Sequence, residues 1–236
     1  MAINSSHRAA VIRNLMPQGC ANLLDVGCGP LTPHYPYAGL AEQITCVDWK
    51  IRRFGEVPTN ITAVDGDFTE LDLPAAKFDV VIAADVFEHI LIEREAAFVE
   101  RCVSALRPGG ALLVSVPHDG RFAGLDPYAL KPAVHRQLWR LGLYRGLHNG
   151  SCDIRKGHKH YQVEELAKAF RPLDVETTVY FGYLFDPLLT WADALSRGSG
   201  RFPGYGALSR ACRREFERDY GNKSFNVAVK FRKLQA

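Results

Sequence analysis

Short apolar runs alternate with helical stretches along the first half of this chain. Five apolar runs predict strands, at residues 21–26, 44–48, 61–66, 78–84 and 111–116. Apolar positions at helical spacing predict helices over residues 6–16 and 93–106, and a short helix limited by nearby prolines ends at 40–43. The run at 78–84 is continuously apolar, which is typical of a parallel strand buried on both faces. Alternating strands and helices predict βαβ units and a parallel sheet.

The alternation becomes irregular after Pro117. A helix at 163–170, a β-rich run at 173–183 and an alternating strand at 224–231 are still expected. The residues around them carry scattered prolines, glycines, and basic and aromatic side chains. We therefore predict a single α/β domain over residues 1–236, with cap-like insertions at about residues 119–160 and 186–222.

Composition and charge narrow the class of protein without defining it. The 236 residues are 47% hydrophobic and 23% charged, which is ordinary for a globular domain. A net charge of +3 is too weak by itself to indicate nucleic acid binding. The six cysteines form no CxxC pair, and the N-terminus has no apolar signal segment. These features favour a cytoplasmic protein without a zinc knuckle, a redox dithiol or a membrane span.

A glycine turn follows the first predicted strand and indicates a ligand site. The sequence Asp25-Val26-Gly27-Cys28-Gly29 lets a ligand approach the backbone closely. A dinucleotide fingerprint needs a third glycine, but Thr32 occupies that position. Asp48 lies about 20 residues further on, at the spacing for a carboxylate that binds ribose hydroxyls. The pattern therefore predicts a ligand that has adenosine but no pyrophosphate.

Several motifs in order resemble those of class I S-adenosylmethionine-dependent methyltransferases, over roughly residues 20–118. The matching segments are residues 24–29, 46–48, 65–68, 78–90 and 106–110, with a weaker echo at 157–161 and 164–166. The segments at 85–90 and 107–110 are most similar to the small-molecule branch that includes ubiquinone-biosynthesis methyltransferases. The resemblance implies a Rossmann-like fold: a seven-stranded, mostly parallel sheet with helices on both faces and an antiparallel last strand.

The resemblance also implies roles for individual residues in binding S-adenosyl-L-methionine. Gly27, Cys28 and Gly29 would line the methionine part, and Asp25 would lie near its ammonium group. Asp48 would bind the ribose, with Trp49 beside it. Asp67 would accept from the adenine amino group, Phe68 would lie against the ring, and Asp85 would sit where cofactor and acceptor meet. Three of these carboxylates have structural alternatives: a solvated strand end for Asp48, a turn cap for Asp67 and a helix N-cap for Asp85. The segment Pro30-Leu31-Thr32-Pro33 departs from the glycine that many relatives carry there.

Transfer of a methyl group to a hydroxyl needs a base, and histidine is the natural one at neutral pH. Candidates near the carboxyl ends of the strands are His89, His118, His158 and His160. We rank His158 first, then His118 and His160, although each could instead be hydrogen-bonded within a loop. Asp85, Glu88 and His89 resemble a metal-associated cluster of some quinone O-methyltransferases, but a structural role is favoured and no metal is predicted.

Residues 121–148 combine basic, aromatic and leucine side chains. Three interpretations stay open: a cap over the acceptor, an amphipathic surface for a membrane or an anionic substrate, and a basic helix that shields the sheet. The leading function is methylation of a small-molecule acceptor, at an oxygen of a natural-product, sugar or lipid-linked intermediate. Alternatives are an RNA or protein methyltransferase and a non-catalytic protein that binds the cofactor. The sequence leaves the oligomeric state open.

Overall fold

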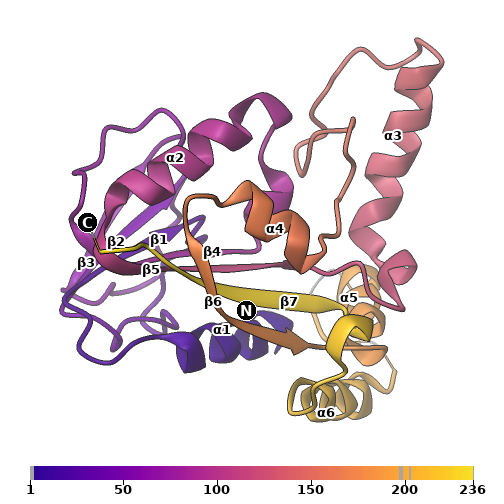
Figure 1. Ribbon diagram of the computed structural model, residues 1–236. Helices are drawn as coiled ribbons and strands as arrows, with labels where there is room; N and C mark the ends of the chain where they lie inside the picture. Colours follow the sequence, from indigo (N-terminus) through magenta and orange to yellow (C-terminus); the bar gives the residue numbers. More distant parts are fainter. Residues whose placement is uncertain (1–2, 197–198, 202, 236) are drawn as a thin grey trace.

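A single twisted sheet organises the computed structural model, which describes residues 3–196, 199–201 and 203–235 (Figure 1). The strand order is β3-β2-β1-β4-β5-β7-β6. The strands are β1 (Asn22–Val26), β2 (Gln43–Asp48), β3 (Ile61–Asp65), β4 (Phe78–Ala84), β5 (Leu106–Pro117), β6 (Asp174–Phe181) and β7 (Asn226–Arg232). Strands β1 to β5 are parallel, whereas β7 runs antiparallel to both β5 and β6. The predicted seven-stranded sheet with an antiparallel last strand is confirmed.

Helices cover both faces of the sheet. Leu24, Val81 and Leu112 face a core that includes α2 (Glu95–Ala105) and α4 (Val163–Ala169). On the other face, Leu23, Val80 and Ile82 pack in a core with α1 (Ile3–Leu15). Because neighbouring residues of a strand point to opposite faces, a strand with a core on each side must be apolar throughout. That requirement explains the continuous apolar run of β4.

A strand start and a short helix differ from the prediction. Strand β5 begins at Leu106, opposite Phe78, and the register then shifts so that Val80 pairs with Ala111. Residues 107–110, expected between the predicted helix at 93–106 and the predicted strand at 111–116, therefore form a bulge within the strand. The helix expected to end at 40–43 is absent, and residues 33–40 form turns. Pro33 and Pro36 remove backbone donors there, and a helix needs those donors.

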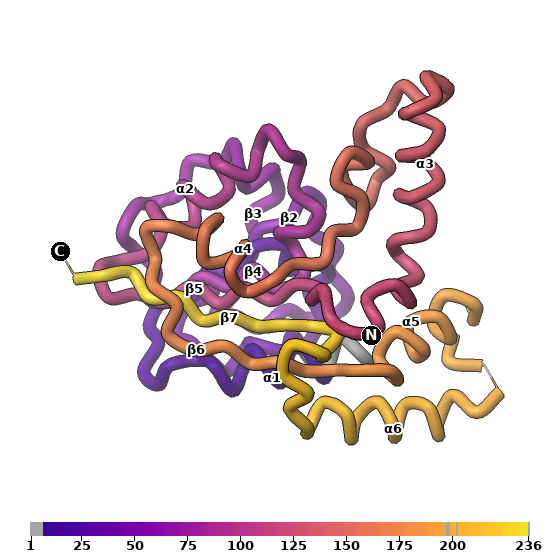
Figure 2. The backbone as a smooth tube through the Cα atoms, turned by 45° about the vertical axis from the view of Figure 1, so that its right-hand side comes forward, coloured from indigo at the N-terminus to yellow at the C-terminus, as the bar shows by residue number. Residues whose placement is uncertain are grey.

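The first irregular segment contains η3 (Ala123–Leu125), η4 (Pro127–Ala129) and α3 (Leu130–Arg140). Helix α3 stands away from the sheet (Figures 1 and 2), and Pro132 is its one buried residue. The helix therefore does not shield the sheet, which was one of its three interpretations. The other two, a cap and a membrane surface, stay open.

The second irregular segment contains α5 (Phe185–Leu195), α6 (Tyr205–Phe216) and η5 (Gly221–Lys223). Helices α5 and α6 pack together, and both contact α1. None of the helices in the described ranges is long and apolar enough to span a bilayer. The division of residues 1–236 into one domain with two insertions stays a prediction.

Candidate active site

The glycine turn lies at the carboxyl end of β1, between the ends of β2 and β4. Gly27 and Gly29 have φ angles of 73° and 64°, and the amide of Gly27 donates to the Val47 carbonyl at 2.8 Å. A Cβ atom on Gly27 would lie only 2.3 Å from Cγ2 of Val86. The turn therefore depends on glycine both for its conformation and for its close packing. Cys28 is half-buried, and its thiol lies 3.4 Å from the Gly29 carbonyl oxygen.

A cavity of about 850 Å³ opens beside this turn. Its walls include Gly27, Asp48, Trp49, Asp67 and Asp85, all of which belong to the predicted cofactor site. Asp48 ends β2, and its Oδ2 accepts from the Gly29 amide at 2.9 Å. The Trp49 side chain is 70% exposed, so its ring is free to contact a ligand. The fold thus gathers polar and aromatic groups from three strand ends around one cavity.

The side chain of Asp67 lines the cavity, whereas that of the neighbouring Phe68 lies in the core. Asp67 Oδ1 accepts from the amide and the hydroxyl of Thr69 at 2.9 and 2.8 Å, and its Oδ2 pairs with Arg94. Phe68 is buried in the core, edge-on to Phe98. Phe68 does not line the cavity, whereas Trp49 does. The structure thus offers Trp49 rather than Phe68 as the aromatic wall for an adenine ring.

Asp25 is buried beneath the glycine turn and accepts a hydrogen bond from the Tyr35 hydroxyl. Burial raises the pKa of Asp25 to about 7. Its side chain is not part of the cavity wall. Contact with a cofactor ammonium group therefore stays a prediction, and it would need to run through a water molecule or a shift of Tyr35.

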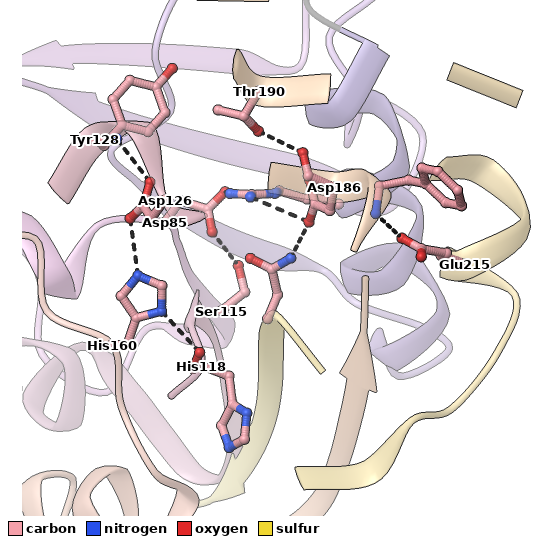
Figure 3. A network of polar contacts seen from close by, with 12 residues as sticks. Asp85, Ser115, His118, Asp126, Tyr128, His160, Asp186, Thr190 and Glu215 are labelled. Atoms are coloured by element: carbon pink, nitrogen blue, oxygen red, sulfur yellow. Dashed lines mark hydrogen bonds and ion pairs between the residues drawn. The ribbon is translucent and has the colours of Figure 1, made fainter. Parts of the chain in front are cut away.

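Asp85 follows β4 in a left-handed conformation, with φ of 55°, which is uncommon for a residue other than glycine. Its Oδ2 accepts from Arg8 of α1 at 2.8 Å, and its Oδ1 accepts from the Ser115 hydroxyl at 3.2 Å (Figure 3). Arg8 also lies 3.7 Å from the buried Asp186. Strained residues persist where the surrounding contacts hold them, as these do, and such residues cluster at functional sites.

A second cavity, of about 350 Å³, lies beyond Asp85. Three residues line both cavities: Asp85, His89 and Ser151. His158 lines the second cavity together with Arg8. A molecule in the second cavity would therefore meet a ligand in the first cavity at Asp85 and His89.

The three histidines predicted as bases lie in different environments. His158 lines the second cavity, and its Nδ1 is hydrogen-bonded to Asp126. His160 bonds the same carboxylate through Nε2 at 3.0 Å. His118 is fully buried, and its Nδ1 lies 3.0 Å from the Ser224 carbonyl oxygen. The His118 side chain does not line the second cavity. The geometry therefore supports His158 over His118 as the histidine that faces an acceptor.

His89 adds a fourth histidine at the junction of the cavities. Its Nδ1 contacts the Ser151 carbonyl, and burial lowers the pKa of His89, which favours the neutral ring. Two sets of side chains bring donor atoms within 4.8 Å of one another and could hold a metal ion. They are Glu88, His89 and His158, and Asp126, His158 and His160.

Arg8, Asp126 and Arg94 are three charged cavity residues that the sequence did not indicate. The sequence around a single arginine in a predicted helix does not indicate where its side chain lies in the folded protein. Asp126 stands 32 residues before His158, so no local motif links them. Only the scarcity of acidic residues within 121–148 distinguishes Asp126, the one acidic side chain in that segment.

The sheet order, the glycine turn and the carboxylate at the end of β2 define an α/β protein built to bind an adenosine-bearing cofactor. The methyltransferase domain family matches residues 24–114. A probable S-adenosylmethionine-dependent methyltransferase of Mycolicibacterium smegmatis is 33% identical over 64% of this chain and 66% of its own length. A ubiquinone biosynthesis O-methyltransferase of Methylocella silvestris is 29% identical over 70% of this chain and 62% of its own length. The chain therefore carries a methyltransferase domain over residues 24–114 and is similar to S-adenosylmethionine-dependent methyltransferases.

Solved structures show the same fold at low identity. A putative methyltransferase from Bacillus halodurans has a TM-score of 0.57 and 15% identity over 96% of this chain and 99% of its own. A Burkholderia thailandensis 1,6-didemethyltoxoflavin-N1-methyltransferase, solved with bound 1,6-didemethyltoxoflavin and S-adenosylhomocysteine, has a TM-score of 0.55 and 14% identity over 99% and 79% of the two chains. The alignments cover 66%, 61% and 61% of the first three curated relatives, all mycobacterial, so this chain spans less than two thirds of their length.

Proposed function

We propose that this chain transfers the methyl group of S-adenosyl-L-methionine to a small-molecule acceptor and releases S-adenosyl-L-homocysteine. The observation that carries the proposal is the meeting of two cavities at Asp85 and His89. The larger cavity holds the predicted cofactor residues, and the smaller one holds His158. Such an arrangement suits in-line transfer, because it holds two reactants on opposite sides of one contact point.

The volume and the lining of the smaller cavity support an oxygen acceptor of modest size. A cavity of about 350 Å³ is in the range of small-molecule sites. Arg8, Tyr128 and Thr190 supply polar groups for a hydroxylated compound. We therefore favour an oxygen of a natural-product, sugar or lipid-linked intermediate as the methyl acceptor.

His158 is the proposed base. The acceptor hydroxyl gives its proton to His158 while its oxygen forms a bond to the methyl carbon. The carbon–sulfur bond breaks, and the sulfur keeps the electron pair. A positioned base of this kind contributes about 10²–10⁴-fold to the rate. The carboxylates around the larger cavity complement the ammonium and sulfonium charges of the cofactor.

Calorimetry with S-adenosyl-L-methionine tests the cofactor assignment. Asp48→Ala should weaken binding at least about tenfold, which corresponds to roughly 1.4 kcal/mol. Asp72→Ala, which removes an exposed carboxylate outside the cavity wall, should leave the affinity unchanged. NADH should show no comparable binding. Equal affinities for wild type and Asp48→Ala would refute the ribose assignment.

Turnover is tested by S-adenosylhomocysteine release with a panel of hydroxylated compounds. His158→Ala should slow turnover and spare the cofactor affinity. Release only with RNA or protein would favour the macromolecular alternative, and release with none of these would favour a non-catalytic binding protein. A cytoplasmic location and the absence of a metal stay predictions, peripheral membrane contact stays one interpretation of residues 121–148, and the oligomeric state stays open.

A further inference from the structure

The Asp126 carboxylate is hydrogen-bonded to two histidines beside the second cavity, which is the proposed site of the acceptor. It lies at the N-cap of η4, and its Oδ1 accepts from the Tyr128 amide at 2.9 Å (Figure 3). Its Oδ2 faces Nδ1 of His158 and Nε2 of His160. Building on the proposed function, we propose that Asp126 and a protonated His160 are positioning residues that fix His158 in the tautomer whose Nε2 lone pair faces the acceptor.

The protonation of His160 follows from its two partners. Nδ1 lies 2.9 Å from the His118 carbonyl oxygen, and Nε2 lies 3.0 Å from Oδ2 of Asp126. Both partner atoms are acceptors, so each ring nitrogen must carry a proton. Burial opposes a charged ring, but the hydrogen bonds to Asp126 and to the His118 carbonyl outweigh burial and raise the pKa of His160. His160 is therefore an imidazolium.

Asp126 stays ionised between the two rings. Burial of this carboxyl favours its neutral form, but the hydrogen bonds from His158 and His160 outweigh burial and hold the pKa of Asp126 well below its usual range. An ionised carboxylate only accepts, so Nδ1 of His158 donates to it. In a neutral His158, which lines the second cavity, the lone pair is then on Nε2. An aspartate that orients a histidine in this way fixes its tautomer and stabilises the imidazolium formed during the reaction.

The other titratable groups around His158 do not replace Asp126. His89 lies with its ring centroid 5.3 Å from that of His158, and its lowered pKa favours the neutral form. Glu88 is buried, and burial raises its pKa. Asp85 is paired with Arg8 across the cavity, and the ring of Tyr128 lies 5.7 Å from that of His158, centroid to centroid. Asp126 is thus the carboxylate that directly bonds the proposed base.

The arrangement gives each proton a definite place. In the resting state His160 holds two protons and His158 holds one, on Nδ1. During methyl transfer the acceptor proton moves to Nε2 of His158, which becomes an imidazolium bonded to Asp126. Loss of that proton to solvent, after the methylated product has left, restores the resting state. The pair of His160 and Asp126 keeps its own charge throughout.

Long-range ¹H–¹⁵N spectra of the histidine rings test the assignment without knowledge of the acceptor. In wild type near pH 7, His160 should show the imidazolium pattern and His158 the neutral pattern with the proton on Nδ1. Asp126→Asn keeps an oxygen for the Tyr128 amide but removes the charge. In this variant the titration midpoint of His160 should fall by roughly one pH unit or more, and His158 should lose its fixed tautomer.

A second variant and a matched control make the result specific. His160→Gln removes the proposed imidazolium, so the imidazolium pattern should disappear from the spectrum while His158 keeps its proton on Nδ1, because Asp126 still accepts from it. Asp193→Asn removes another carboxylate that lines the same cavity and bonds the Tyr205 hydroxyl instead, so both histidine patterns should be unchanged. A wild-type His160 that is neutral near pH 7, or unchanged histidine signals in Asp126→Asn, would overturn the proposal.

Metal analysis of the purified protein adds an independent check. A stoichiometric metal ion bound through Nδ1 of His158 would also overturn the proposal, because that nitrogen could no longer donate to Asp126. Cofactor binding reports on the proposed function separately. Asp48→Ala should lose affinity for S-adenosyl-L-methionine while the His158 and His160 spectra stay as in wild type. The two proposals can therefore fail independently.

Discussion

Replacement of Gly27 by alanine tests how the glycine turn holds its shape. The φ angle of 73° costs an L-residue about 1–2 kcal/mol. The new Cβ would also lie 2.3 Å from Cγ2 of Val86, and such overpacking costs about 1–3 kcal/mol. We expect Gly27→Ala to lose roughly 2–5 kcal/mol of unfolding free energy. At about 2–4 °C per kcal/mol for a chain of this size, the melting temperature should fall by roughly 4–20 °C.

Gly29 in the same turn provides the matched control. Its φ angle is 64°, but a Cβ there would have no neighbour within 4 Å. Gly29→Ala should therefore lose only the backbone contribution, about 1–2 kcal/mol. Thermal and urea unfolding of both variants separate conformational strain from steric overlap.

The double variant Gly27→Ala/Val86→Ala identifies the overlap directly. Truncation of Val86 removes Cγ2, so it should restore part of the stability lost in Gly27→Ala and produce a coupling energy of about 1 kcal/mol or more. Equal stability of Gly27→Ala and Gly29→Ala, or perfect additivity in the double variant, would refute the reasoning.

Three further predictions concern charge. Arg8→Met removes the guanidinium beside the buried Asp186 and Asp85, and should cost about 3–5 kcal/mol in chemical unfolding near neutral pH. Burial raises the pKa of Asp186, so this carboxyl takes up a proton more readily in the native state than in the unfolded chain. The loss of unfolding free energy in Arg8→Met should therefore be smaller in acid. A loss that does not change with pH would contradict this prediction. The native pKa of about 7 for Asp25 predicts that stability falls as pH rises from about 4 to 7, by up to about 1.4 kcal/mol per unit, and Asp25→Asn should flatten that slope in unfolding curves measured across this range. If the segment at 121–148 contacts membranes, the protein should sediment with anionic vesicles, and Leu143→Glu on its exposed apolar surface should reduce that binding; equal sedimentation with zwitterionic vesicles would argue against a charge-driven contact.

The parallel strands of the first half could be predicted because buried parallel strands leave apolar runs such as 78–84, whereas the seven-stranded sheet with an antiparallel last strand followed from the resemblance. The bulge at 107–110 could not be predicted, because Arg107-Pro108-Gly109-Gly110 has the composition of a turn and only its pairing beside Phe78 makes it part of β5. Propensity describes the local chain, and pairing is decided by distant residues.

The candidate site likewise has residues that the local sequence predicts and residues whose place is decided by distant parts of the chain. Asp48 and Asp85 border the cavity because each lies at or just after the carboxyl end of a strand, a position that a motif does encode. Phe68 was expected against the adenine ring, but it is adjacent to Asp67 and points into the core. A motif gives the spacing of residues but not the direction of each side chain. The partnership of Asp126 with His158 arises only when the chain folds back over 32 residues.

Ser151 has a consequence for how the affinities for the two proposed ligands depend on each other. It belongs to the loop after α3 and yet forms part of the wall of both cavities, where its carbonyl holds His89. If a bound acceptor shifts this loop, the cofactor cavity changes as well, and the two proposed ligands are then energetically coupled. Thermodynamic linkage then requires reciprocity: the factor by which an acceptor changes the affinity for the cofactor is also the factor by which the cofactor changes the affinity for the acceptor.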